Sequence, residues 1–447
     1  MPDCDLLVLG AGPGGHAAAL EGATRGARVI VLEPDRVGGQ CVQHTCIPTQ
    51  AMLSAIAPFV TAQELAIAGV VDIGDTISLG RATARKDALV GVVARGAALS
   101  LEAAGVEVIA GTGSLDGRDR VVVRHPDGST EQLGAQAIVI ATGARWEPAR
   151  IDGVPDARVV TLDAINALEK APRTAAVLGG GPAGTAFALE HAFLLAATGV
   201  AVSFVPEGDA LVPGLDQDLD PVLREALGAL GVTITAPGDH DAVLEAEVVA
   251  GPDTRRPHID GLALDGFGIE RDPATGGVRV DGSARTSTEG IYAVGDVTGD
   301  VMLSSAAAHA GRVAAVGATG GSARLAFGSI PRVLHIDPPV GWVGRDEAGA
   351  RREGYDPACS IVDLGRTPRG VVLGGRGGAM KLVTDRELGQ VLGVHAVGPD
   401  APEIVALGAI ALAAELTVHD LAATVHWHPS GAETIGEAAR DCVRRIG

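Results

Sequence analysis

The chain is poor in aromatic residues, in lysine and in net positive charge. Aromatics make up 2% of its 447 residues and apolar residues 47%, so its cores must be built from Ala, Val, Leu and Ile. Lysine occurs three times, at Lys86, Lys170 and Lys381. The net charge of −20 at pH 7 disfavours nucleic acid and anionic membranes as partners, because both are bound through basic surfaces.

Long hydrophobic runs and a basic leader are also missing. No stretch approaches about 18 uninterrupted apolar residues, so we expect no transmembrane helix and no membrane partner. The opening residues MPDCDLLVLG lack a basic region and run directly into an apolar strand pattern, which argues against a secretory signal. These absences predict a cytoplasmic protein.

Cysteine is scarce, with five residues in the whole chain, which excludes a disulfide framework. Cys4, Cys359 and Cys442 are isolated and are expected to be inert thiols, and we expect no metal site. The other two, Cys41 and Cys46, lie in GGQCVQHTCIPTQ. Five helical steps separate Cα atoms by roughly 7.5 Å, whereas a disulfide requires about 4.4–6.8 Å. A regular helix could not close this pair, so spacing alone leaves its role open.

A dinucleotide-binding pattern begins at the first cysteine. In CDLLVLGAGPGGHAAALEGATRGARVIVLEPD, an apolar run precedes Gly10, Gly12 and Gly15, an Ala-rich helical stretch follows, and a second apolar run ends at Glu33. Such glycines allow a tight turn and bring backbone N–H groups close to a pyrophosphate, while the terminal acid accepts hydrogen bonds from ribose hydroxyls. Strand, helix, strand and acid together predict a complete nucleotide site.

A second copy of this pattern starts near residue 173. Gly179, Gly181 and Gly184 again follow an apolar run and open a helix. The second strand, expected over 200–205, ends before a Pro-Glu pair rather than in an acid. A second Rossmann-like unit is therefore predicted. Two interpretations of it stay open: it binds NAD(P), or its nucleotide binding is weakened.

The remaining segments complete an α/β architecture. AIVIATG and TSTEGIYAVGD each place a buried strand before a glycine, the second one before Asp296. From about residue 330, the strand-like runs AMKLVTD and QVLGVHAVG alternate with a long Ala-rich helix near 402–415. No third nucleotide pattern occurs there, which predicts a separate α+β domain.

In their order along the chain, these motifs resemble the pyridine nucleotide–disulfide oxidoreductases, the glutathione reductase and dihydrolipoyl dehydrogenase family. The resemblance covers nearly the whole chain and includes GGQCVQHTCIPT and the C-terminal HWHPSGAE. It implies two Rossmann-like domains and a C-terminal α+β dimerisation domain in a homodimer. The implied division is an FAD-binding domain over 1–148, an NAD(P)-binding-like domain over 149–278, a segment returning to the FAD domain over 279–329, and the interface domain over 330–447.

The same resemblance assigns cofactor residues. FAD is the implied cofactor, and NAD(P) is implied at the second unit. The residues expected to bind these cofactors are, for FAD, Gly10, Gly12, Gly14, Gly15, Glu33, Gly39, Gly143 and Asp296, and for NAD(P), Gly179, Gly181 and Gly184.

Catalytic roles also follow from the resemblance. Cys41 and Cys46 would form the redox disulfide, with Cys46 next to the flavin and Cys41 exchanging with the substrate sulfur. A thiolate is the nucleophile in such exchange, so a base is needed. His428, oriented by Glu433 and supplied by the partner subunit, would be that base. The Pro after it suits a fixed and even cis peptide bond, while His426 lacks such support and is expected to be structural.

The NAD(P) side departs from the family pattern. Relatives carry a lysine where this chain has Gln50, and its glutamate partner is replaced by Ala186. The loss of both residues together has a physical reason. Removing only one partner of a buried ion pair leaves an unpaired charge and costs roughly 3–5 kcal/mol of stability. Pro182 and Pro206 stand at the usual nicotinamide gate and ribose acid. No basic cluster follows the 200–205 strand, which favours NAD over NADP.

Three functions fit these observations. The first is an enzyme that passes electrons between a small or carrier-bound thiol or disulfide, the cysteine pair, FAD and NAD(P)(H). The second is an NAD(P)-independent flavoprotein oxidase or dehydrogenase that acts on a thiol-bearing metabolite with oxygen as acceptor. The third is a flavin-holding binding or regulatory protein, which the cysteine pair and the His–Glu pair disfavour. The substrate, the direction and the role of His44, an extra base or an exposed residue, stay open.

Overall fold

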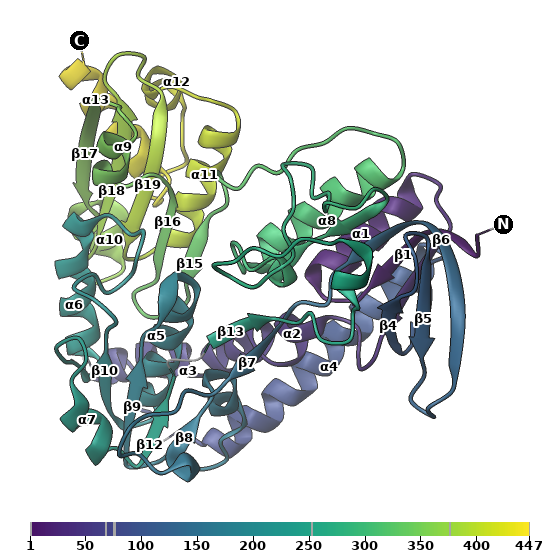
Figure 1. Ribbon diagram of the computed structural model, residues 1–447. Helices are drawn as coiled ribbons and strands as arrows, with labels where there is room; N and C mark the ends of the chain where they lie inside the picture. Colours follow the sequence, from purple (N-terminus) through teal and green to yellow (C-terminus); the bar gives the residue numbers. More distant parts are fainter. Residues whose placement is uncertain (1, 68, 75–76, 252–253, 375–376, 447) are drawn as a thin grey trace. The chain divides into compact units, whose positions relative to one another are not determined.

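The computed structural model describes residues 2–67, 69–74, 77–251, 254–374 and 377–446 (Figure 1). The chain folds as two compact units, each made of several segments. The first unit comprises residues 1–52, 80–147 and 253–327, and the second comprises residues 53–79, 148–252 and 328–447. The four-part division expected above stays a prediction.

A parallel sheet with an antiparallel extension forms the centre of the first unit. Strand order is β3-β2-β1-β6-β5-β4, and β14 pairs with β6. β1, β2, β3, β6 and β14 are parallel, whereas β4 and β5 extend the sheet antiparallel to β6. The strands are β1 (Cys4–Leu9), β2 (Val29–Glu33), β3 (Glu107–Ala110), β4 (Thr112–Leu115), β5 (Arg120–Arg124), β6 (Thr130–Ile140) and β14 (Ile291–Ala293).

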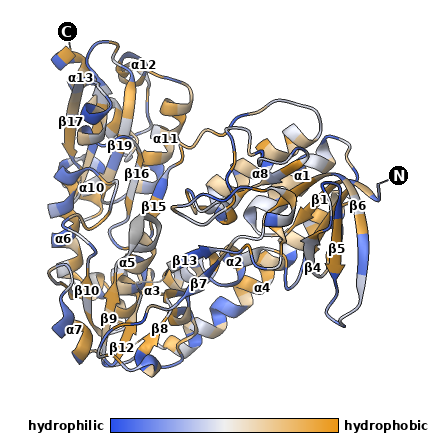
Figure 2. Cartoon of the chain, in the orientation of Figure 1, coloured by the Kyte–Doolittle hydropathy of each residue, from blue (hydrophilic) through white to orange (hydrophobic). Residues whose placement is uncertain are grey.

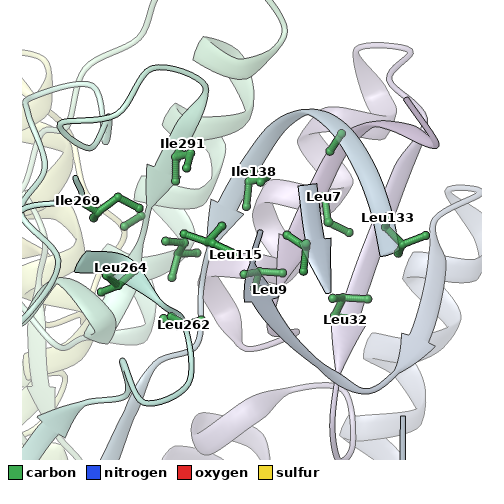
Figure 3. Close-up of a cluster of buried hydrophobic side chains, with 14 of the residues drawn as sticks. Leu7, Leu9, Leu32, Leu115, Leu133, Ile138, Leu262, Leu264, Ile269 and Ile291 are labelled. Atoms are coloured by element: carbon green, nitrogen blue, oxygen red, sulfur yellow. The ribbon is translucent and has the colours of Figure 1, made fainter. Parts of the chain in front are cut away.

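Apolar residues on both faces explain why these strands lie at the centre. In β1 five of six residues are buried, as expected for a parallel strand covered on both sides. On one face, side chains of this sheet pack with residues of the 262–269 segment (Figure 3). The labelled members of this cluster are Leu7, Leu9, Leu32, Leu115, Leu133, Ile138, Leu262, Leu264, Ile269 and Ile291.

Helices and a small ribbon complete the first unit. Helix α1 packs on α8 through glycines: a Cβ on Gly311 would collide with the carbonyl oxygen of Gly14. The antiparallel pair β7–β13 forms a separate ribbon. The elements are α1 (Pro13–Thr24), α2 (Gly39–Gln43), α3 (Cys46–Ile67, which continues into the second unit), α4 (Leu79–Ala103), α8 (Ser304–Ala318), β7 (Ala144–Glu147), β13 (Thr254–Pro257), η4 (Leu264–Phe267) and η5 (Gly295–Thr298).

The second unit contains another parallel sheet, in the order β11-β10-β9-β12-β8. Hydrophobic residues run along β9 and β12 (Figure 2). This arrangement confirms the second Rossmann-like unit. Its elements are β8 (Val159–Val160), β9 (Thr174–Leu178), β10 (Ala201–Val205), β11 (Val232–Ile234), β12 (Val248–Ala250), α5 (Gly181–Ala197), α6 (Asp220–Ala229), α7 (His240–Glu245), η1 (Asp156–Arg158), η2 (Leu162–Ala167) and η3 (Gln217–Leu219).

An antiparallel sheet with helices forms the C-terminal part of the same unit, in the order β15-β16-β19-β18-β17. The strands and the helix expected from AMKLVTD, QVLGVHAVG and residues 402–415 are β18, β19 and α11, which confirms the α+β prediction. The elements are β15 (Arg332–Leu334), β16 (Val340–Gly344), β17 (Pro357–Asp363), β18 (Ala379–Asp385), β19 (Val391–Val397), α9 (Glu347–Arg352), η6 (Leu364–Arg366), α10 (Pro368–Val372), α11 (Ala401–Ala413), α12 (Val418–Ala423) and α13 (Glu433–Ile446).

Among the described residues, one helical stretch, Gly39–Ile67, is long and apolar enough by length and composition to cross a membrane. The sequence had predicted none, because polar residues such as Thr49 and Gln50 interrupt every apolar run there. Of the most apolar part of this stretch, 44% is buried inside the protein, and core helices of soluble proteins meet the same criterion. The expected cytoplasmic location stays a prediction.

Candidate active site

The two central cysteines lie on either side of a helix break. Cys41 belongs to α2, and Cys46 is the first residue of α3. His44 ends α2 with φ −131° and ψ −31°, outside the helical region. The break removes the geometric obstacle that a continuous helix would impose, and the two thiols hydrogen-bond to each other. Both are free thiols, Cys41 half-buried and Cys46 exposed.

The two thiols differ in acidity. The pKa of Cys46 is lowered to about 6, first by the hydrogen bond from Cys41 and further by hydrogen bonds from Ser304 and Thr45 and by the positive charge of Arg255. Cys46 is also the first residue of α3, and the partial positive charge at a helix N-terminus favours a thiolate there. The pKa of Cys41 is raised, because its proton is held in the bond to Cys46 and because burial opposes its ionisation. Cys46 is therefore the thiolate of the pair, and Cys41 is the thiol that needs a base.

The first glycine loop is too tight for side chains. Gly10 has φ +104°, and a Cβ there would lie 2.5 Å from the carbonyl oxygen of Ala141. A Cβ on Gly15 would collide with the carbonyl oxygen of Gly10, and one on Gly39 would lie 2.7 Å from the Cα of Gly12. The loop, the start of α1 and the start of α2 therefore approach one another through bare backbone.

This cradle fits a dinucleotide. Gly12 precedes α1 without any side-chain cap, so the first N–H groups of that helix are available to an anion. The side-chain oxygen of Gln40, in α2, is buried without a hydrogen-bond partner in the protein. Gly143 has φ +73°, and a Cβ added to it would meet no atom within 4 Å. A Cβ added to Gly14 would lie 3.1 Å from a methyl group of Val294. The residues present are thus compatible with FAD.

Of the two acids expected to contact FAD, Glu33 is buried and Asp296 is half-buried. Glu33 accepts hydrogen bonds from the backbone of Ala11 (2.7 Å) and Asp35 (3.1 Å), and burial raises its pKa. Asp296, in η5, is ion-paired to Arg255. Burial raises the pKa of Asp296, and the Arg255 charge opposes that shift.

Arg255 is a site residue that the sequence reasoning missed. It lies on β13, its guanidinium sits 5.1 Å from the centre of the Trp146 ring, and it donates to the carbonyl oxygen of Met302 at 2.9 Å. Its positive charge lowers the pKa of Cys46. The neighbouring Arg255 and Arg256 were the available signal, but arginine pairs are common on protein surfaces.

The second glycine loop is less crowded. Gly180 precedes α5 without a side-chain cap, so the helix start again offers N–H groups. A Cβ on Gly179 would lie 3.2 Å from the Phe204 ring, but one on Gly184 would meet nothing within 4 Å. Gly181 is the first residue of α5, and the side chain of Pro182 lies outside the described part of the chain.

His428 and Glu433 form a pair at the start of α13. His428 Nδ1 lies 3.0 Å from Glu433 Oε1, and Glu433 Oε2 accepts from the backbone N–H of Ser430 at 2.9 Å. Both contacts lower the pKa of Glu433, with the backbone bond the larger cause. The His428–Pro429 peptide bond is cis. The His428 side chain is 65% exposed, and among the described residues its hydrogen bond is made by Nδ1 and not by the other ring nitrogen.

Family comparisons match this arrangement. The family model described as pyridine nucleotide-disulphide oxidoreductase covers residues 4–311, and that of the family's dimerisation domain covers residues 330–439. The chain belongs to this family. It is a flavin-dependent oxidoreductase that acts on sulfur groups, its cofactor is FAD, and its C-terminal domain indicates a homodimer.

Relatives in this family align over their whole length. The chain is 33% identical to a dihydrolipoyl dehydrogenase of Chlorobaculum tepidum, over 99% of this chain and 98% of the relative. It is 32% identical to a dihydrolipoyl dehydrogenase of Thermus scotoductus, over 98% and 97%. A crystal structure of LpdA from Mycobacterium tuberculosis superposes with a TM-score of 0.88 at 28% identity, covering 98% of this chain and 99% of that one. The alternative of an oxidase gains no support from these comparisons.

Proposed function

We propose that the enzyme oxidises a dihydrolipoyl-type dithiol and passes the electrons through the Cys41–Cys46 disulfide and FAD to NAD⁺. The hydrogen-bonded cysteine pair beside the glycine cradle carries this proposal, because its two thiols have opposite tendencies to ionise. The names of the relatives support the lipoyl group as substrate.

The cysteines divide the exchange between them. A substrate thiolate attacks Cys41 of the disulfide, and Cys46 leaves as a thiolate because its pKa of about 6 makes it the better leaving group. The second substrate thiolate then attacks the mixed disulfide and releases Cys41. Two substrate thiols become one disulfide, and the cysteine disulfide becomes a thiol and a thiolate. Of the two substrate protons, one ends on Cys41 and the other stays on His428.

His428 moves the protons of this exchange. Its imidazole accepts the proton of the substrate thiol and later returns a proton to Cys41, whose raised pKa favours the thiol form. Glu433 holds the Nδ1 side of the ring, which leaves the opposite nitrogen for the substrate. Bound FAD would accept the electron pair from the reduced cysteines and hand it on as hydride.

The partner subunit supplies His428 in this proposal. The loop that carries it also exposes Val425 and Trp427, which are 93% and 68% accessible. Large apolar side chains this exposed, next to a catalytic pair, suit a surface that a second subunit covers. The homodimer thus completes each site with residues of both chains.

NAD⁺ is proposed at the second glycine loop. The uncapped start of α5 can accept a pyrophosphate, and no basic side chain follows directly after β10 to hold a 2′-phosphate. The lysine–glutamate pair that relatives keep is absent at Gln50 and Ala186. We expect the enzyme to use NAD⁺ with a slower hydride step than relatives that keep this pair.

An anaerobic titration tests the proposal. Dihydrolipoamide, NADH and NADPH are added separately to the FAD-loaded enzyme, and the flavin spectrum is recorded after each equivalent. We expect one equivalent of dihydrolipoamide or of NADH to change the flavin spectrum, and NADPH to act more slowly. Reduction by dihydrolipoamide alone, with rapid reoxidation only in air, would contradict the proposed use of NAD⁺.

A further inference from the structure

The Cys46 sulfur has a neighbour that the exchange described above does not use. Ser304 Oγ lies 3.3 Å from Cys46 Sγ, and the same hydroxyl acts to lower the pKa of the Cys41 thiol. Ser304 is the first residue of α8, is half-buried, and stands 258 positions along the chain from Cys46. Only the folded chain brings these groups together.

A second hydroxyl contacts the same sulfur. Thr45 Oγ1 lies 3.7 Å from Cys46 Sγ, and Thr45 is buried. Its proton also has an acceptor in the Gln40 carbonyl oxygen, at 3.1 Å. The Ser304 contact is the shorter one, and Cys46 is the hydrogen-bond partner of its hydroxyl among the described residues.

We infer that Ser304 is a positioning residue that holds Cys46 as a thiolate by donating its hydroxyl proton to the sulfur, with Thr45 adding a weaker contact. This inference rests on the proposed function. A hydrogen bond to a charged acceptor is about twice as strong as one to a neutral acceptor, so the hydroxyl favours the thiolate over the thiol. A stabilised thiolate is also the better leaving group when the substrate attacks Cys41.

Other charged groups near the sulfur do not replace this contact. Cys41 faces Cys46 from α2, and Arg255 and Asp296 act on the pair from β13 and η5. Arg255 is ion-paired to Asp296, and its charge lowers the Cys46 pKa less than the hydrogen bonds do. Short hydrogen bonds therefore decide the ionisation, and they lower the Cys46 pKa in the same direction as the Arg255 charge.

The test uses the Cys41→Ser enzyme loaded with FAD. Without Cys41 no disulfide can form, so Cys46 stays a free sulfur beside oxidised flavin, and its thiolate gives a long-wavelength absorbance that can be titrated with pH. We expect Ser304→Ala in this background to raise the midpoint by about 1–2 pH units, the size of a hydrogen bond to a charged group. Thr45→Val should raise it by less.

Three controls make the result specific. Ser304→Thr keeps a hydroxyl and should restore the midpoint, and Ser305→Ala, an exposed neighbour on the same helix, should leave it unchanged. The rate of Cys46 alkylation by iodoacetamide, followed by mass spectrometry over the same pH series, should shift in parallel. If Ser304→Ala fails to bind FAD, two measurements replace its absorbance titration. One is the absorbance midpoint of Thr45→Val, and the other is the pH dependence of Cys46 alkylation in Ser304→Ala.

The outcomes separate this inference from the proposed function. An unchanged midpoint and alkylation profile in Ser304→Ala, in a parent that shows the absorbance, overturns the role of Ser304 and leaves the relay standing. A parent without the absorbance at any pH shows that Cys46 does not lie beside the flavin, and the proposed function then fails together with this inference.

Discussion

At the scale of single residues, the site depends on groups that hold a proton or release it. Cys46 ionises more easily than an ordinary thiol, Cys41 less easily, and Glu433 stays ionised to lower pH because Ser430 and His428 donate to it. A carboxylate with a lowered pKa loses its charge only when the pH falls below the ordinary range for glutamate. Glu433 should therefore keep its charge, and its contact with His428, to lower pH than an ordinary glutamate would.

Replacing the base tests this division of roles. We expect His428→Gln to reduce kcat for the dithiol half-reaction by about 10²–10⁴-fold, the range of general acid–base catalysis, with FAD still bound. Glu433→Gln should lose less, because the imidazole remains and only its carboxylate partner at Nδ1 is replaced. His419→Gln changes an exposed histidine of α12 and serves as the control. Full activity of His428→Gln would remove the proposed base.

At the scale of elements, the first glycine loop, α1 and α2 meet without room for side chains. Gly15 and Gly184 hold equivalent positions in the two loops, but only Gly15 is in close contact with backbone. We expect Gly15→Ala to purify with less than half of the FAD of the wild-type enzyme, and Gly184→Ala to keep it. Flavin absorbance per mole of chain measures this. Equal FAD content in both variants would mean that the contact is not needed for FAD binding.

A buried lysine connects three elements of the second unit. Lys381 in β18, 1% exposed, contacts Asp216 at 2.9 Å, Asp218 at 2.6 Å and Glu347 at 2.7 Å. Asp216 and Asp218 come from the segment before α6, and Glu347 begins α9. The fold therefore places three carboxylates around one cation, and removing the cation leaves them to repel each other.

Stability should reflect this cluster. We expect Lys381→Ala to lower the free energy of unfolding by about 3 kcal/mol at pH 7, the lower end for a broken buried pair because Asp218 and Glu347 are partly exposed. Lys170→Ala, at an exposed lysine, is the matched control. Urea denaturation measures both, and equal stability of the two variants would contradict the estimate.

The same cluster predicts how stability changes with acid. Lys381 lowers the pKa of Glu347 to about 2 and helps to lower that of Asp216. Because both folded pKa values lie below those of the unfolded chain, the stabilisation is complete above about pH 4 and is lost as the pH falls toward about 2. The wild-type enzyme should therefore lose more stability than Lys381→Ala over this interval. Parallel acid curves would show that the cluster does not contribute.

The sequence predicted this molecule best where one short segment decides the structure. The glycine loops, the strands around them and the His428–Glu433 pair all arise within about 30 residues, and the structure contains each of them. Ser304, Arg255 and Lys381 were missed, because each meets its partners across 34 to 258 positions. Periodicity shows which face of an element is buried, but not which distant residue packs there.

At the scale of the whole molecule, each active site is expected to need two subunits. Cys41→Ser and His428→Gln should each be inactive as homodimers. After mixing and reassembly, half of the dimers are mixed, and each holds one site with an intact cysteine from one chain and an intact histidine from the other. We expect about a quarter of wild-type activity in the mixture. If the histidine acts within its own chain, the mixture stays inactive.

The most direct measurement for the cysteine relay compares wild-type and Cys41→Ser enzymes, both loaded with FAD, in anaerobic stopped flow with dihydrolipoamide. The wild-type flavin spectrum should change within a single turnover, whereas the variant should keep its FAD and show no change. A variant that responds to the dithiol as fast as the wild-type enzyme would contradict electron transfer through Cys41 and Cys46.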